Sequence, residues 1–195
     1  MESELIWRST GDPGFEHVRI DEGHPEWTVF DSMFVREHEG VVRRGGYTLI
    51  VDKAWRVLEL RLMVEQAPGS MTALHIMASG DGRWVDANQN PIPALDGCID
   101  IDIRWSPLTN TLPIRRLALG EEEREIRVAY VSLPDLDIRP VTQRYRRVDD
   151  ATVRYWSESL PEGVLIAVDE DAFVVDYPGA FHREWPLPDA PGPGM

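Results

Sequence analysis

Alternation of apolar and polar residues is the feature that most limits what this chain can fold into. Between Ile99 and Ile103 every second residue is isoleucine, and Asp100 and Asp102 occupy the positions between them. A period of two is typical of a β-strand with one buried face, because successive side chains point to opposite sides of a strand. The chain also holds eighteen Val and twelve Ile against thirteen Ala, a composition that favours strands over helices.

The same alternation recurs along the chain, and turn residues bound it at short intervals. We expect further strands around 27–35, 58–64, 126–130 and 141–145, and turns at 80–82, 88–91 and 169–171, where Gly, Asp, Asn and Pro gather. A helical period is weak throughout; only 120–127, which contains three consecutive glutamates, is a candidate for a short helical turn. The pattern predicts a mostly antiparallel sheet, closed or nearly closed on itself, with little helix.

The chain length predicts one domain. Its 195 residues are enough to bury about 70% of the surface that the unfolded chain exposes. We place this domain at residues 1–185. Residues 186–195 contain four prolines and two glycines, and we expect them to form a disordered tail because they offer little apolar surface to bury.

The charge balance narrows the partners and the location. With 20 Lys and Arg against 34 Asp and Glu, the formal net charge is −14, and such a surface repels the phosphate backbone of nucleic acid. Glu2 and Glu4 stand where a secretory signal carries basic residues, and no run approaches ~18 apolar residues. We therefore expect a cytoplasmic protein that has no transmembrane segment and does not bind nucleic acid.

Cysteine and histidine give no metal or redox pattern. Cys98 is the single cysteine, which excludes an internal disulfide and a multi-cysteine zinc site, and we expect it to be a buried inert thiol. The five histidines lack metal-ligand spacing, and His75, which stands between Leu74 and Ile76, is expected to lie in the core or line a barrel. Nucleophile-elbow and phosphate-loop motifs are also missing, so no cofactor and no metal is expected.

Asp100 and Asp102 are the strongest local candidates for chemistry. On one face of a strand their carboxylates lie about 7 Å apart, at ~3.3 Å rise per residue. Such a pair can hold a divalent cation or act as acid and base. The alternative is structural: an outward strand face whose carboxylates pair with Arg104, Arg115 or Arg116.

The segment from Ser106 to Leu117 follows this strand and contains two prolines around a Thr-Asn-Thr core. We interpret it as a crossing loop, because proline is not compatible with a central strand. In one reading Asn110 and the threonines satisfy backbone groups at a structural corner. In the other, Arg115 and Arg116 offer planar donors to an anion or a lipid headgroup.

The run from Gly97 to Ile103, together with the segment from Ser106 to Leu117, resembles the bacterial family called Putative glycolipid-binding. Further matches follow in order at Tyr47, Val51-Asp52, Trp55, Gly82, Trp84, Ala129-Tyr130-Val131, Pro134-Asp135-Leu136, Gln143-Arg144-Tyr145, Asp169, Asp176-Tyr177-Pro178-Gly179, Phe181 and Arg183. The chain departs from the family where Thr-Pro-Phe is usual and Ser106-Pro107-Leu108 stands here, and where Ala172 replaces a turn glycine. The resemblance implies a spiral or barrel-like β-roll, similar in shape to bacterial carriers of lipoproteins and lipids, and supplies no catalytic residues.

We interpret the chain as all-β: a mostly antiparallel sheet curved into a barrel-like spiral β-roll that encloses or half-encloses an apolar space. The expected function is non-enzymatic binding of an amphipathic ligand, a glycolipid or other lipid, inside the roll. Seven Trp, five Tyr and five Phe are enough to line such a space as well as to fill a core. The expected ligand-binding residues are Asp100, Asp102, Thr109, Asn110, Arg115, Arg116, Gln143 and Tyr145.

Two alternatives from other functional classes stay open. One is an enzyme that acts on a small molecule at the mouth of the roll, with Asp100, Asp102 and Arg115 as its polar group. The other is a protein-interaction module that uses an exposed edge.

Overall fold

The computed structural model describes residues 2–67 and 69–187, and these residues form one 14-stranded sheet, one α-helix and one 3-10 helix. The α-helix is α1 (Leu108–Arg116) and the 3-10 helix is η1 (Pro93–Leu95). The strands are β1 (Glu2–Ser9), β2 (Gly14–Asp21), β3 (Trp27–His38), β4 (Val41–Asp52), β5 (Val57–Ala67), β6 (Ser70–Ala78), β7 (Trp84–Asp86), β8 (Asp100–Ile103), β9 (Arg124–Val131), β10 (Ile138–Asp149), β11 (Thr152–Ser157), β12 (Leu160–Val168), β13 (Val174–Tyr177) and β14 (Phe181–Trp185). The tail expected at 186–195 lies outside the described residues from 188 onward.

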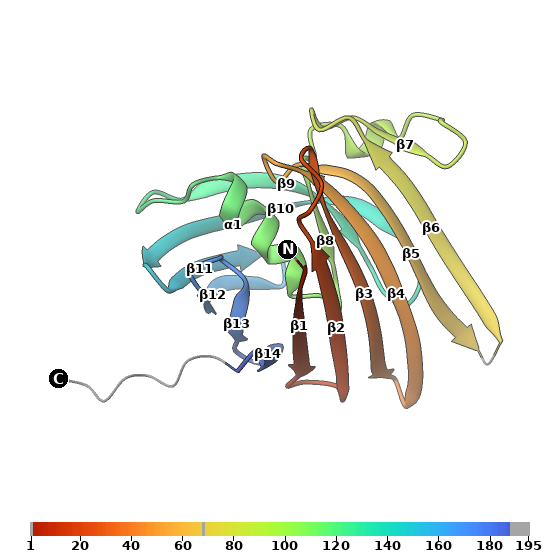
Figure 1. Cartoon of the computed structure of the whole chain (residues 1–195), viewed down its shortest axis with the longest axis horizontal. Coiled ribbons are helices and arrows are strands. Elements are labelled where there is room, and N and C mark those ends of the chain that lie inside the picture. The colour runs from red at the N-terminus through yellow and green to blue at the C-terminus, as the bar shows by residue number, and fades with distance from the viewer. Residues whose placement is uncertain (1, 68, 188–195) are drawn as a thin grey trace.

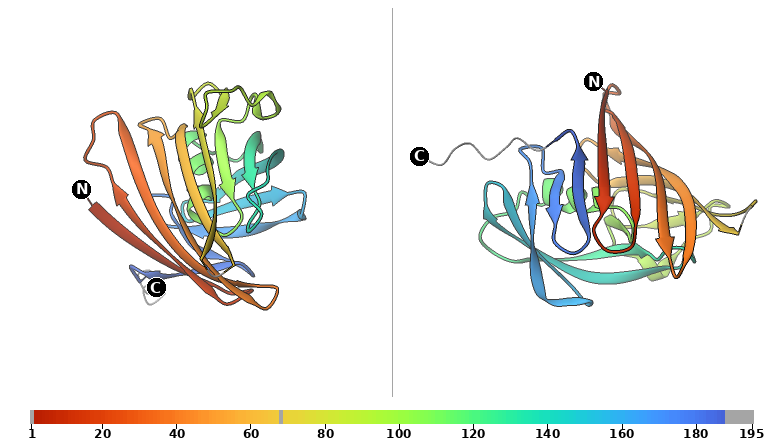
Figure 2. Two further views of the ribbon diagram at one scale, coloured as in Figure 1. Left: turned by 90° about the vertical axis from the view of Figure 1, so that its right-hand side faces the viewer. Right: turned by 90° about the horizontal axis from the view of Figure 1, so that it is seen from below.

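Two meanders make up the sheet: the first runs from β1 to β7, and the second runs from β9 to β14 and carries β8 at its edge. The strand order is β7-β6-β5-β4-β3-β2-β1-β14-β13-β12-β11-β10-β9-β8. The meanders join where the first strand pairs with the last, with Trp7 of β1 opposite Arg183 of β14 (Figures 1 and 2). Neighbouring strands are antiparallel except for β8 and β9, which run parallel. Parallel neighbours need a crossover connection, and α1 lies within the connection between these two strands.

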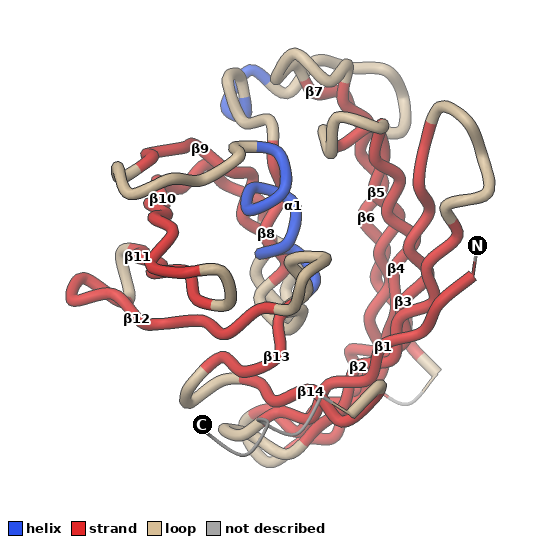
Figure 3. Tube along the Cα trace, turned by 60° about the vertical axis from the view of Figure 1, so that its left-hand side comes forward, coloured by secondary structure: helices blue, strands red, loops and turns tan. Residues whose placement is uncertain are grey.

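The sheet curls around α1, so that the helix lies between the two meanders (Figure 3). Leu108 and Leu112 of α1 pack in one core cluster with Leu49 and Leu60 from the first meander. Ile114, further along the same helix, packs with Tyr155 and other residues of the second meander. The sheet is open at its ends and curved, which confirms the expected all-β, barrel-like roll with little helix.

The expectation of a crossing loop after β8 is wrong, because this segment forms the helix α1. Pro107 precedes the helix, where a missing N–H costs nothing, but Pro113 lies inside it and removes a backbone hydrogen bond. Seven of the nine helix residues are buried. Tertiary packing of this kind outweighs weak local helix propensity.

Other local expectations have mixed outcomes. Strands confirm the predicted alternating segments, and Gly80 and Gly82 have φ of 75° and 89° in the turn between β6 and β7. The helical turn expected at 120–127 is wrong, since β9 begins at Arg124. The outward acidic face expected on β8 is also wrong: Asp100 has no exposed surface, because α1 and β9 cover the strand.

Candidate functional site

Most of the expected ligand-binding residues meet inside the roll. Asp102 of β8 accepts a 2.6 Å hydrogen bond from Nε2 of Gln143, and Thr109 Oγ1 lies 3.4 Å from its other oxygen. The hydroxyl of Tyr145 donates to Gln143 Oε1 at 3.0 Å and accepts from Asn110 Nδ2 at 3.1 Å. This chain of hydrogen bonds joins β8, α1 and β10. We call Asp102, Thr109, Asn110, Gln143 and Tyr145 the interior polar cluster.

The two arginines at the end of α1, Arg115 and Arg116, bind different partners. Arg116 forms a two-pronged ion pair with the buried Asp100, at 3.0 and 2.5 Å. Arg115 instead pairs with Asp171 at 2.9 Å, and its guanidinium lies 4.1 Å from the ring centre of Trp55. Asp100, Asp102 and Arg115 therefore do not form the joint polar group that the sequence suggested.

Burial shifts the pKa of both aspartates upward. It raises the pKa of Asp100, and the ion pair with Arg116 acts in the opposite direction. It raises the pKa of Asp102 from its ordinary 3.8 to about 6, against hydrogen bonds from Gln143 and Thr109. Burial, followed by the charge of Asp102, raises the pKa of Tyr155 as well. The partners of these carboxylates are groups of the protein itself, so the contacts hold α1 against the sheet.

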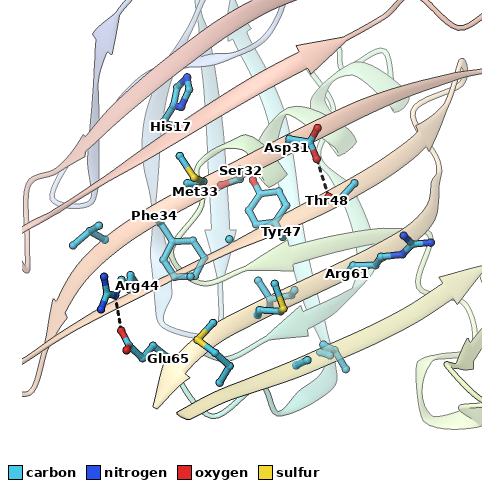
Figure 4. Close-up of a pocket in the computed structure, with 18 of the residues that line it drawn as sticks. His17, Asp31, Ser32, Met33, Phe34, Arg44, Tyr47, Thr48, Arg61 and Glu65 are labelled. Atoms are coloured by element: carbon cyan, nitrogen blue, oxygen red, sulfur yellow. Dashed lines mark hydrogen bonds and ion pairs between the residues drawn. The ribbon is translucent and has the colours of Figure 1, made fainter. Parts of the chain in front are cut away.

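A hollow lies on the outer face of strands β2 to β6, the face that points away from the interior of the roll (Figure 4). Its volume is about 1160 Å³. Its most exposed apolar residues are Phe15, Met33, Val35, Met63 and Met71. Their neighbours along the strands, such as Phe34 and Leu62, point inward and belong to the core. We call this hollow the outer groove. The expected ligand space was inside the roll, where buried side chains of the sheet and α1 pack together.

Glycine opens the centre of the outer groove. Gly46 of β4 stands between Met33 of β3 and Met63 of β5 in the strand register, so the middle strand carries no side chain there. A Cβ atom added to Gly46 would lie 2.3 Å from the backbone oxygen of Ser32. The close approach of these strands therefore requires glycine, and the two methionines form walls around the gap.

Polar side chains surround the apolar part of the outer groove. Arg44 pairs with Glu65 at 2.7 Å, and Thr48 donates a 2.7 Å hydrogen bond to Asp31. Arg61 and His75 reach the same carboxylate, that of Glu59, at 2.7 and 2.8 Å. His75 thus lies on the outer face of β6, and the expectation that it occupies the core or the barrel interior is wrong.

A buried carboxyl lies beneath the groove. Ser32 and Tyr47, which line its floor, each donate a 2.8 Å hydrogen bond to Oε1 of Glu16. Oε2 of Glu16 is buried without a partner among the described residues. Burial raises the pKa of Glu16 from its ordinary 4.5 to about 7, and the two hydroxyls together with Arg36 oppose that rise.

The sequence carried a signal for the outer groove that strand periodicity alone did not capture. In the runs Met33-Phe34-Val35 and Leu62-Met63-Val64 apolar residues occupy consecutive positions, so they face both sides of the sheet. A single buried face explains only half of them. The other half predicts a second apolar surface, and the structure places it on the outside.

Within residues 2–67 and 69–187, no three His, Cys, Asp or Glu side chains gather in a way that could hold a metal ion. Cys98 is buried, as expected, and burial raises the pKa of its thiol. In the same described part of the chain, no helix is long and apolar enough to cross a membrane.

Comparison with known proteins gives one family and one solved structure. The family model described as Putative glycolipid-binding matches residues 4–183. The chain is also similar to a DUF1089 family protein from Pseudomonas aeruginosa, at 36% sequence identity and a TM-score of 0.79. That match covers 91% of this chain and 95% of the other. No curated protein matches.

Proposed function

Because the chain belongs to the Putative glycolipid-binding family, we propose that it binds a lipid with an uncharged, hydroxyl-rich headgroup, and that the outer groove holds an acyl chain. One observation carries the proposal: five exposed apolar side chains gather in a single hollow of about 1160 Å³. Small-molecule sites commonly measure ~300–1,000 Å³ and are mainly apolar. A contiguous exposed apolar patch on a soluble protein generally marks a binding surface.

Methionine side chains are well suited to contact a bound acyl chain. Met33, Met63 and Met71 are unbranched and flexible, so their side chains can adapt to a chain without a fixed shape. Full burial of a methylene contributes ~0.8 kcal/mol, and an open groove covers about half of the chain surface. Two additional methylenes should therefore strengthen binding by ~0.8 kcal/mol, or about fourfold.

The polar surroundings of the groove favour a neutral headgroup. Arg44 and Arg61 are already paired with Glu65 and Glu59. The third arginine of the groove, Arg19, lies directly opposite Asp31 in the strand register, so the three arginines offer an anion little uncompensated charge. Paired charges still present donors and acceptors to hydroxyl groups. A sugar has many such hydroxyls and no charge to neutralise, which fits this arrangement better than a phosphate or a sulfate.

A ligand-binding role for Asp100, Asp102, Thr109, Asn110, Arg115, Arg116, Gln143 and Tyr145 stays a prediction. We assign the interior polar cluster and the Asp100–Arg116 pair a supporting role, because their hydrogen bonds connect α1 to the sheet. Ligand binding inside the roll would have to break these contacts. The groove needs no such rearrangement.

Isothermal titration calorimetry with alkyl maltosides tests the proposal. Octyl, decyl and dodecyl maltoside share one sugar headgroup, and each can be used below its critical micelle concentration. We expect affinity to rise about fourfold from each detergent to the next, and maltose alone to bind too weakly to detect. Equal affinity along the series would contradict the assignment of the groove to an acyl chain.

A matched pair of variants locates the site. Met63 lies in the groove and Leu165 of β12 lies elsewhere, and the two side chains are similarly exposed, at 54% and 50%. Met63→Glu should weaken dodecyl maltoside binding at least tenfold, because it places a charge against the chain. Leu165→Glu should leave binding unchanged. Equal losses in both variants would place the site outside the groove.

A further inference from the structure

The two edges of the sheet, one at each end of its strand order, differ in how far they are covered. At one end, Asp100, Ile101 and Ile103 of β8 have almost no exposed surface. At the other end, β7 pairs only with Ile76–Ala78, the last three residues of β6. Figure 1 shows β7 beside one end of β6 only. Within the described part of the chain, Ser70–His75 therefore have a strand neighbour on one side, β5, and none on the other.

This free edge lacks the features that usually protect an edge strand. Natural edges carry charges, prolines or bulges that prevent pairing with another chain. The nine residues of β6 contain no Asp, Glu, Lys, Arg or Pro, although 28% of the whole chain is charged. Its only ionisable side chain, that of His75, is hydrogen-bonded to Glu59. From Met71 to His75 the edge is a neutral row of backbone donors and acceptors whose residues pair one to one with β5. The one register shift of this pairing lies between Glu65 and Ala67 on β5, next to Ser70.

We propose that β6 pairs with β6 of a second copy of this chain, antiparallel about a two-fold axis at Thr72. In an antiparallel pair, opposing residues share a face of the sheet. A two-fold axis at Thr72 sets Met71 opposite Ala73 of the second copy and Ser70 opposite its Leu74. The five residues from Ser70 to Leu74 are all free of β7, so this register requires no change in the fold.

Chemical self-complementarity identifies the second copy as the occupant. The outer face of the paired strands would hold Met71 and Ala73 from both copies, which continues the apolar row of the groove. Opposing threonines form favourable cross-strand pairs. The like charges that would oppose self-pairing are lacking on this strand. Such an interface is at the small end of specific interfaces, so the dimer should be weak.

The net charge gives the dimer a salt dependence. Each chain carries −14, and repulsion between two copies is screened beyond ~8 Å at physiological ionic strength. Added salt should therefore raise the dimer fraction. Because the two sheets join edge to edge, the outer groove stays open, and the dimer does not depend on lipid binding.

Light scattering after size exclusion tests this interface over a concentration series that reaches the low-millimolar range. The mass should rise from 22.2 kDa toward twice that value, more steeply in high salt. Thr72→Lys and Thr72→Glu should each stay monomeric, because like charges then oppose each other across the axis. An equimolar mixture of these two variants should recover a dimer. Thr72 is exposed, so both variants should fold, and circular dichroism checks this.

A control and two outcomes decide the proposal. Val148→Lys changes an exposed residue of β10, away from this edge, and should dimerise like the wild type. A wild-type protein that stays monomeric throughout the series would overturn the proposal, even if an extended peptide from another protein binds the edge. A dimer that both single Thr72 variants retain would overturn it as well.

Discussion

Replacing Glu16 with glutamine should change the pH dependence of stability in a defined way. Glu16 has 2% of its surface exposed, and its Oε2 is buried without a partner among the described residues. Burial raises the pKa of its carboxyl from 4.5 to about 7. Glutamine has nearly the same shape and can accept the hydrogen bonds from Ser32 and Tyr47, but it carries no charge at any pH.

The magnitude and sign of this change in the free energy of unfolding follow from proton linkage. Between pH 4.5 and about 7 the folded protein holds a proton on Glu16 that the unfolded chain has lost. The free energy of unfolding therefore falls as pH rises through this interval, by about 1.4 kcal/mol per pH unit and about 3 kcal/mol in all. This contribution is fully favourable below pH 4.5 and is lost above about 7. Glu16→Gln lacks it.

Urea denaturation at pH 5 and pH 8, followed by tryptophan fluorescence, measures the effect. We expect the difference between Glu16→Gln and wild type to shift by about 2–3 kcal/mol in favour of the variant from pH 5 to pH 8. Any constant cost of placing an amide at this site cancels in that comparison. Glu125→Gln, at an exposed position of β9, is the control and should show no such shift. An equal difference at both pH values would refute the reasoning.

Two further changes test the interior of the fold. Asp100→Ala leaves the guanidinium of Arg116 in a largely buried position without its partner, and urea denaturation should show a loss of about 3–5 kcal/mol; a loss below about 1 kcal/mol would contradict a structural role for this pair. Gly163→Ala should cost at least 1 kcal/mol more than Gly179→Ala in the same assay, because both glycines have positive φ but only the first would bring its new Cβ within 2.5 Å of Trp156 Nε1. Equal losses would show that the contact with Trp156 relaxes without cost.

Strand positions could be predicted from the sequence because their signal is local. The isoleucines at 99, 101 and 103 predicted β8, and the glycines at 80 and 82 predicted the turn before β7. Burial of the opposite face of β8 could not be predicted in the same way. Asp100 is covered because α1 returns across the strand and delivers Arg116 to it, a contact between residues 16 positions apart.

The helix and the groove show two other limits of local patterns. Pro113 argues against a helix on propensity alone, and only the burial of α1 between the two meanders explains its presence. In the outer groove, Met33 and Met63 come together because β4 lies between their strands and carries Gly46 at that point. Consecutive apolar residues indicate that a second surface exists. Strand order and register decide where it forms.

Methyl NMR of protein labelled with ¹³C at the methionine methyl groups tests the groove as a lipid site most directly. The chain has six methionines, of which Met33, Met63 and Met71 line the groove. On titration with dodecyl maltoside below its critical micelle concentration, we expect these three signals to shift along one saturable curve. The signal of Met77, which lies on β6 outside the lining of the groove, should stay in place. Maltose should leave all six signals unchanged. Saturable binding that leaves the signals of Met33, Met63 and Met71 in place would contradict the account.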